Sequence, residues 1–127
     1  MMKARATSFA TMKDMVGYIR CRDEGGSAKA CLSQGDNGIG CWGDVTARLD
    51  VAMCAVPRSE MVRHWGSKNN ARGKQVRVNL TQRGAVIICE VRDQAPDGII
   101  DLNPGALIEA GMPPDTELNE PAEWEWL

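Results

Sequence analysis

Polar and apolar residues alternate without interruption over residues 75–80, which predicts a half-buried β-strand. Turn-forming residues follow at 81–84, and an apolar-rich segment returns over residues 85–92. We therefore expect a β-hairpin whose second strand is the more deeply buried of the two. This hairpin is the most clearly predicted unit of the chain.

Further short strands are predicted from apolar or alternating segments that turn residues bound. They cover residues 4–9, 51–56, 99–102 and 123–127. In the last of them the alternation places Trp124 and Trp126 on one face, where we expect both to belong to the core.

One short helix is framed by capping residues. Asn103 is a good N-cap, Pro104 suits the first helical position and Gly111 suits the position after the last turn, so a helix over residues 104–110 is expected. Residues 58–65 are interpreted as a second short helix. Two other segments lack a regular period and are interpreted as turn-rich or loop regions, namely residues 12–40 and 93–98.

The composition favours a β-rich barrel. The 127 residues are 43% hydrophobic and 25% charged, as in ordinary globular proteins, and 13 glycines with 6 prolines indicate many turns between short strands. We therefore expect one mainly β domain over residues 1–127. No apolar stretch approaches the roughly 20 residues that span a bilayer, so a membrane partner is not expected.

The charge balance argues against nucleic acid as a partner. Lys and Arg number 15 against 17 Asp and Glu, a net charge of −2, whereas nucleic-acid binders carry a clustered basic excess. We interpret the basic residues between Arg58 and Arg77 as a solvated face and expect a monomer. Residues 1–5 lack the apolar segment of a secretion signal, so the chain either acts without ordinary secretion or has lost a leader.

The chain has one histidine, His64, and five cysteines, at positions 21, 31, 41, 54 and 89. In an oxidising compartment four cysteines could pair, and Cys89, inside the predicted buried strand, is then the expected free thiol. A zinc site would need unusual spacings, and no orienting motif accompanies a Cys–His64 pair. We expect neither a metal site nor a cofactor.

Three segments together resemble the rare-lipoprotein-A-like double-psi β-barrel family. Residues 73–78 read GKQVRV, residues 89–96 read CEVRDQAP and residues 98–103 read GIIDLN, while residues 6–9, ATSF, are similar to the opening strand of the family. The resemblance implies a six-stranded double-psi β-barrel with one or two short helices. The same barrel occurs in expansins, small endoglucanases, lytic transglycosylases and some protease inhibitors, so the fold leaves the function open.

The resemblance carries two acidic residues over as candidate catalytic groups. Asp101 matches the general acid of the endoglucanases, and Asp93 matches the acid of the transglycosylase turn. An acid that protonates a leaving oxygen must stay protonated near neutral pH, which burial beside Ile100 and Leu102 promotes. The alternatives are that Asp101 only ties a loop or the helix start, and that Asp93 only accepts hydrogen bonds from backbone N–H groups.

This sequence lacks two residues of the family's catalytic sites, which limits the reaction mechanisms that the resemblance implies. The second carboxylate of the endoglucanases would fall at Ala10, and the histidine of the transglycosylases would fall near Met53. The resemblance therefore implies a single-acid enzyme, most concretely a lytic-transglycosylase-like protein that cleaves peptidoglycan, or a related glycoside-hydrolase-like cleavage of polysaccharide. We expect an extracellular or cell-wall-directed protein, for example one delivered by a phage.

Four tryptophans are more than a small barrel core requires, and sugar faces stack on aromatic rings. We expect Phe9, Trp42, Asp44 and Trp65 to line a substrate-binding groove, with ordinary packing as the alternative for the aromatic rings. Two other functions stay open. One is an expansin-like, non-catalytic polysaccharide binder, and the other is a double-psi protease inhibitor that acts through exposed loops such as residues 34–40.

Overall fold

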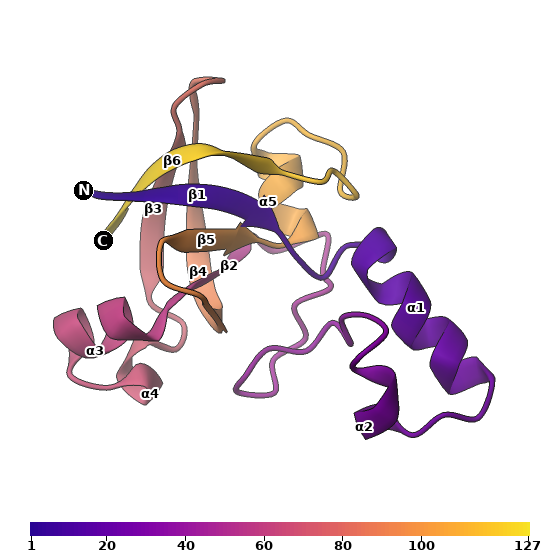
Figure 1. The fold of residues 1–127 in the computed structure, drawn as a ribbon. Helices are drawn as coiled ribbons and strands as arrows, with labels where there is room; N and C mark the ends of the chain where they lie inside the picture. The colour runs from indigo at the N-terminus through magenta and orange to yellow at the C-terminus, as the bar shows by residue number, and fades with distance from the viewer.

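A computed structural model describes residues 1–127, and its centre is a closed barrel of six strands (Figure 1). The strands are β1 (Met2–Ser8), β2 (Met53–Pro57), β3 (Gln75–Leu80), β4 (Ala85–Ala95), β5 (Ile99–Leu102) and β6 (Asn119–Trp126). They are hydrogen-bonded in the order β1-β5-β2-β4-β3-β6, and β6 closes on β1. The pairs β1–β5 and β2–β4 are parallel, and the other pairs are antiparallel. This closed mixed barrel confirms the predicted fold class and fits the double-psi type.

The barrel interior holds one cluster of 20 buried residues, to which every strand contributes alternate side chains. Trp124 is buried there, and Trp126 packs against the cluster half-buried, with its ring centroid 5.2 Å from that of Trp124. The predicted closing strand with both tryptophans on one face is therefore confirmed.

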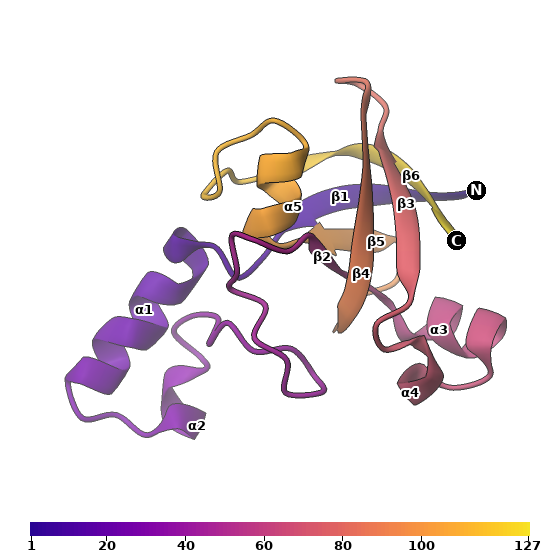
Figure 2. The same cartoon turned by 180° about the vertical axis from the view of Figure 1, so that it is seen from behind.

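The hairpin of β3 and β4 is present, but its second strand is not the more deeply buried one. Val86 and Ile88 point away from the core and are 58% and 45% exposed. The hairpin projects from one end of the barrel (Figures 1 and 2), so only one face of each strand has a core to cover.

Strand β4 also continues through the segment that we expected to be a loop. Asp93, Gln94 and Ala95 pair in parallel with Ala55, Val56 and Pro57 of β2. The reason is non-local, because the hydrogen-bonding partner of this segment lies about 40 residues earlier in the chain.

Five helices surround the barrel: α1 (Met12–Asp23), α2 (Ala28–Cys31), α3 (Arg58–Trp65), α4 (Lys68–Ala71) and α5 (Pro104–Glu109). The two predicted helices, α3 and α5, are confirmed. The Asn103 side chain accepts a hydrogen bond from the Ala106 N–H as the N-cap of α5, and Gly111 has the expected positive φ of 85°. None of the helices combines the length and the apolar character needed to cross a membrane.

The prediction of irregular chain over residues 12–40 was wrong for α2 and for the longer helix α1. Thr11 caps this helix by accepting a hydrogen bond from the Asp14 N–H, yet only Cys21 among its residues is buried. Because α1 buries no apolar stripe, its sequence shows no helical period. Gly17 allows a close approach within this region, since a Cβ at that position would lie 2.1 Å from the backbone oxygen of Gln34.

Helices α1 and α2 form a lobe beside the barrel (Figures 1 and 2), joined by a disulfide between Cys21 and Cys31. The structure therefore pairs two cysteines rather than four. Cys41 is free and exposed, whereas Cys54 and Cys89 are free and buried in the barrel, so the expectation of a buried Cys89 thiol is confirmed.

Candidate functional site

The two candidate acids lie in one row across the outer face of the barrel. Ala55 of β2 is in register with Asp93 on one side and with Asp101 on the other, and Asp101 is in register with Thr7 of β1. Residues in register across neighbouring strands point to the same face, and two strand spacings amount to about 10 Å. We refer to Asp93, Ala55, Asp101 and Thr7 as the acid row.

Asp101 is the more enclosed of the two acids. The Thr7 hydroxyl donates a hydrogen bond to its carboxylate. Burial raises the pKa of the Asp101 carboxyl above its ordinary value; the Thr7 hydrogen bond opposes this rise, and the negative charge of Asp93 adds to it. A carboxyl with a raised pKa can hold a proton at higher pH than an exposed one, as a general acid must.

Asp93 has a structural task. Its Oδ1 accepts hydrogen bonds from the backbone N–H groups of Cys41, at 2.9 Å, and Gln94, at 2.8 Å. The carboxylate therefore ties the chain before β2 to strand β4. None of the five main surface cavities is lined by Asp93 or Asp101.

The segment that Asp93 holds is a tight hairpin of residues 38–46, called here the 38–46 loop. The N–H of Thr46 bonds to the oxygen of Gly38, and the N–H of Gly40 bonds to that of Asp44, each at 2.8 Å, while Ile39 and Val45 pair across the loop. The Gly43 N–H closes the tip on the oxygen of Gly40 at 2.9 Å. The loop is therefore ordered by its own backbone.

Gly40 seats this loop on the barrel. A Cβ at Gly40 would lie 2.1 Å from the backbone oxygen of Arg92, so only glycine allows this approach to β4. Asp44 adds a bidentate ion pair with Arg72, at 2.8 and 3.1 Å, and contacts Arg92 at 3.6 Å. The hydrogen bond from Arg72 lowers the pKa of Asp44, with the positive charges of Arg72 and Arg92 acting in the same direction and burial opposing them.

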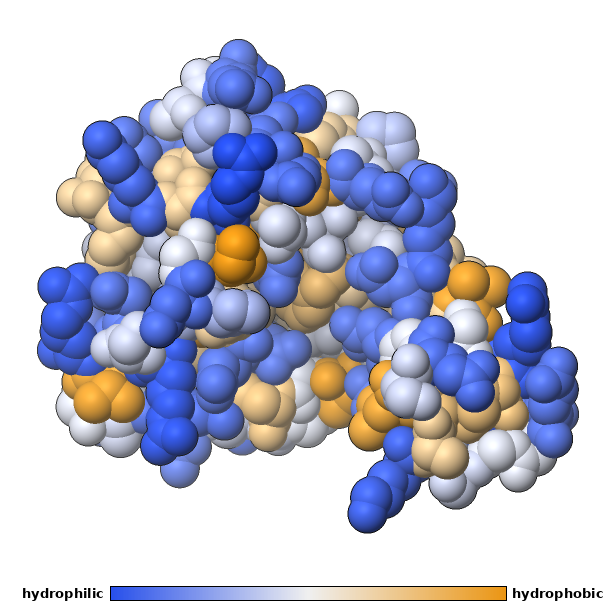
Figure 3. Space-filling view, viewed as in Figure 1, coloured by the Kyte–Doolittle hydropathy of each residue, from blue (hydrophilic) through white to orange (hydrophobic).

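Although its backbone is anchored, the loop presents apolar side chains to solvent. Ile39 is 48% exposed between two buried glycines, and Val45, its cross-loop neighbour, is 55% exposed. Figure 3 shows apolar residues at the surface in the lower middle of this face, in the region of the loop beside the α1–α2 lobe. The loop thus holds an exposed apolar pair in a fixed geometry.

A buried asparagine fastens the far end of the same segment. Asn103 donates from Nδ2 to the backbone oxygens of Thr46 and Val51, at 2.9 and 3.0 Å, and accepts at Oδ1 from the N–H groups of Met53 and Ala106. Both sides of the 38–46 loop are therefore fixed to the barrel. From the sequence Asn103 was predicted only as a helix cap, because its partners before β2 are about 50 residues away.

The residues that we expected to line a sugar groove instead contact other residues of the protein. Phe9 is buried in a small cluster that includes Ala55 of the acid row. The carboxylate of Asp44 forms ion pairs with Arg72 and Arg92. The indole of Trp42 donates to Asn69 at 3.0 Å, and the Lys68 ammonium lies 5.8 Å from its ring centroid. The ring of Trp65 is covered by Lys74, at 4.5 Å, and by Trp126, at 5.8 Å.

Sequence reasoning placed the exposed loop at residues 34–40, whereas the exposed apolar pair belongs to residues 38–46. The signal that could have found it is the glycine spacing, with Gly38, Gly40 and Gly43 around Ile39, typical of a tight hairpin.

Neither a known protein family nor a curated protein sequence matches this chain. Among solved structures, one described as "Streptomyces papain inhibitor (SPI)" is similar, with a TM-score of 0.50 and 20% sequence identity. The similarity covers 97% of this chain and 92% of that chain. At this level of identity the similarity supports the barrel fold alone and leaves membership of the rare-lipoprotein-A-like family a prediction.

Proposed function

We propose that this protein inhibits proteases of the papain type, and that the 38–46 loop is the segment that contacts the enzyme. The observation that carries the proposal is the exposed pair of Ile39 and Val45 on a loop that is fixed by its own hydrogen bonds and by Asp93, Asp44 and Asn103. The similarity to a papain inhibitor over nearly the whole of both chains supports it.

A loop that is already ordered suits inhibition for a physical reason. Binding costs conformational entropy, and a segment that is rigid before binding pays less of it. Inhibitors of proteases in general bind with little change of backbone. Because Ile39 and Val45 are already about half-buried, their complete burial in an enzyme cleft would contribute about 1–1.5 kcal/mol for each side chain.

The test is inhibition of papain measured with a fluorogenic peptide substrate. Ile39→Asp and Val45→Asp should each raise the inhibition constant by about 10-fold or more, because each loses about 1–1.5 kcal/mol of apolar burial and places a charge in the interface. The matched control is Val86→Asp on the β3–β4 hairpin, where an equally exposed valine, at 58%, lies at the opposite end of the molecule from the loop. The control variant should inhibit like the wild type.

Failure of the wild-type protein to inhibit papain and related cysteine proteases at micromolar concentration would contradict the proposal. Inhibition that Ile39→Asp and Val45→Asp leave unchanged would contradict the assignment of the loop.

The raised pKa of Asp101 favours a second candidate function, single-acid cleavage of a cell-wall glycan. Its test is incubation with peptidoglycan, chitosan and cellulose, followed by mass spectrometry of the products. Asp101→Asn should abolish cleavage while the protein stays folded. Binding of glycan without any product would favour an expansin-like binder instead, and the absence of both binding and cleavage would remove glycan as a partner.

A further inference from the structure

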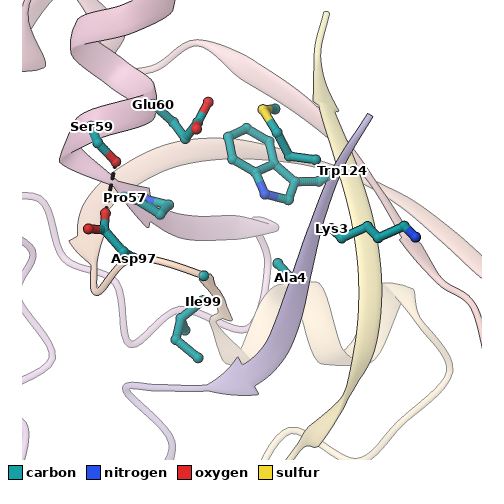
Figure 4. Close-up of a pocket in the computed structure, with 10 residues that line it drawn as sticks. Lys3, Ala4, Pro57, Ser59, Glu60, Asp97, Ile99 and Trp124 are labelled. Atoms are coloured by element: carbon teal, nitrogen blue, oxygen red, sulfur yellow. Dashed lines mark hydrogen bonds between the residues drawn. The ribbon is translucent and has the colours of Figure 1, made fainter.

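A pocket of about 270 Å³ opens at the end of the barrel where α3 meets strands β1 and β6 (Figure 4). We call it the barrel-mouth pocket. Its apolar lining includes Ala4, Pro57, Ile99 and Trp124, and its polar lining includes Ser59, Glu60 and Asp97. The volume is slightly below the range of about 300–1,000 Å³ for pockets that hold drug-sized molecules, so it suits a smaller group such as one side chain.

Trp124 supplies a hydrogen-bond donor without an acceptor in this pocket. Its side chain is 1% exposed, and Figure 4 shows the indole nitrogen directed into the space between Pro57 and Ala4. The only side-chain hydrogen bond among the lining residues joins the Ser59 hydroxyl to Asp97, at 2.8 Å. Solvent reaches the indole nitrogen through the open pocket. An occupant that displaces this solvent must bring an acceptor, because the N–H would otherwise be left without a partner at a cost in free energy.

The polar side of the pocket offers acceptors. Asp97 uses one carboxylate oxygen for Ser59, and Glu60 pairs with Arg63, so each keeps lone pairs for a donor. Lys3 also belongs to the lining, but Figure 4 shows its ammonium pointing away from the other residues. The occupant therefore needs one acceptor for the indole and at least one donor for the carboxylates.

Charge decides which occupant fits. A carboxylate would be repelled by Asp97 and Glu60. An ammonium would leave the indole N–H without an acceptor, and it would face the first turn of α3, where Pro57 provides no side-chain cap and the helix end carries partial positive charge. A neutral primary amide meets both needs, because its oxygen accepts and its NH₂ group donates.

We propose that the barrel-mouth pocket binds a glutamine or asparagine side chain of a partner protein. The amide oxygen accepts from the Trp124 indole, the amide NH₂ donates to Asp97 or Glu60, and the aliphatic stem packs on Pro57 and Ile99. This contact does not involve the 38–46 loop and is therefore separate from the proposed inhibition.

The test is NMR of the protein with ¹⁵N-labelled tryptophan, in which each of the four indole N–H groups gives its own signal. Replacing Trp42, Trp65 and Trp126 by Phe one at a time removes one signal each and assigns the Trp124 signal by elimination, without replacing that buried residue. Trp126→Phe also moves the Trp124 signal, because the two rings are in contact. The probe is N-acetylglutamine methylamide. The matched control is N-acetylmethionine methylamide, which keeps the backbone amides and the side-chain length but lacks the side-chain amide.

We expect the glutamine probe to shift the Trp124 signal saturably and the methionine probe to leave it in place. Asp97→Asn and Glu60→Gln together should weaken binding about fivefold or more, whereas Glu109→Gln, outside the pocket, should not. An equal shift with both probes would overturn the proposal, as would no shift with either. A shift with methyl glucoside but not with glutamine would also overturn it and assign the pocket to a polyol.

Discussion

The backbone N–H of Cys41 donates a 2.9 Å hydrogen bond to the carboxylate of Asp93, and this contact joins the 38–46 loop to strand β4. The same carboxylate lies in register with Ala55 and stands in one row with Asp101. A residue that the sequence offers as a catalytic acid therefore also holds the loop that we propose as the inhibitory segment.

Replacing Asp93 tests this anchoring role. Asp93→Ala should lower the free energy of unfolding by about 1–2 kcal/mol, because two backbone donors lose a charged acceptor at a partly exposed site. Amide hydrogen exchange at Cys41 should become faster. Asp93→Asn keeps an acceptor oxygen and should have the smaller effect, and unchanged exchange at Cys41 in the alanine variant would contradict the anchoring role.

Gly40 and Gly43 give a matched pair within one loop. Gly40→Ala places a Cβ 2.1 Å from the backbone oxygen of Arg92, so the loop must leave the barrel, and we expect a loss of about 2 kcal/mol or more with weaker inhibition. Gly43→Ala meets no atom within 4 Å and carries only the strain of its positive φ of 90°, about 1–2 kcal/mol. Urea unfolding and inhibition assays of both variants measure the difference. Equal inhibition by the two variants would contradict the seating role of Gly40.

The raised pKa of Asp101 predicts the sign of a pH effect on stability. Since the folded protein holds this proton more tightly than the unfolded chain, ionisation of Asp101 costs stability as pH rises through its folded pKa, and the cost is absent below the unfolded value of about 3.9. Asp101→Asn keeps an acceptor for Thr7 and removes the charge. It should therefore raise the urea midpoint at pH 7 and leave it unchanged near pH 3, whereas a lower midpoint at pH 7 would contradict the burial of an ionisable carboxyl.

Asn103 should be among the most sensitive positions of the chain. Asn103→Ala leaves the oxygens of Thr46 and Val51 and the N–H groups of Met53 and Ala106 without their partners, which we expect to cost about 3 kcal/mol or more. Ser27→Ala, which removes the exposed N-cap of α2, should cost only about 1 kcal/mol. Urea unfolding of both variants provides the comparison. Similar losses of unfolding free energy in the two variants would contradict the role of Asn103 in holding these segments together.

The three free cysteines differ in their exposure to solvent. Cys41 is exposed and should react with a thiol reagent in the native protein, whereas Cys54 and Cys89 should react only after unfolding. Mass spectrometry of the labelled protein counts the modified thiols under each condition. Rapid native labelling of Cys89 would show that β4 opens easily.

Local sequence patterns determined the parts of this protein whose causes are local. The alternation of β3 and β6, the cap at Asn103 and the glycine at position 111 after α5 depend on neighbouring residues, and all of them are present in the structure. Helix α1 has a local cap at Thr11 but buries only Cys21, so its sequence lacks the apolar period by which helices are recognised.

The tertiary structure decided what depends on distant partners. Asp93 belongs to a strand because β2 pairs with it, and it holds Cys41 because residues far apart in the chain meet at one sheet face. The pairing of Ala55 with both Asp93 and Asp101 brings the two acids into one row. Hydrogen bonds and burial between such segments leave no periodic trace in the sequence. The sequence therefore indicated that Asp93 could accept hydrogen bonds from backbone N–H groups, but not that Cys41 is a donor.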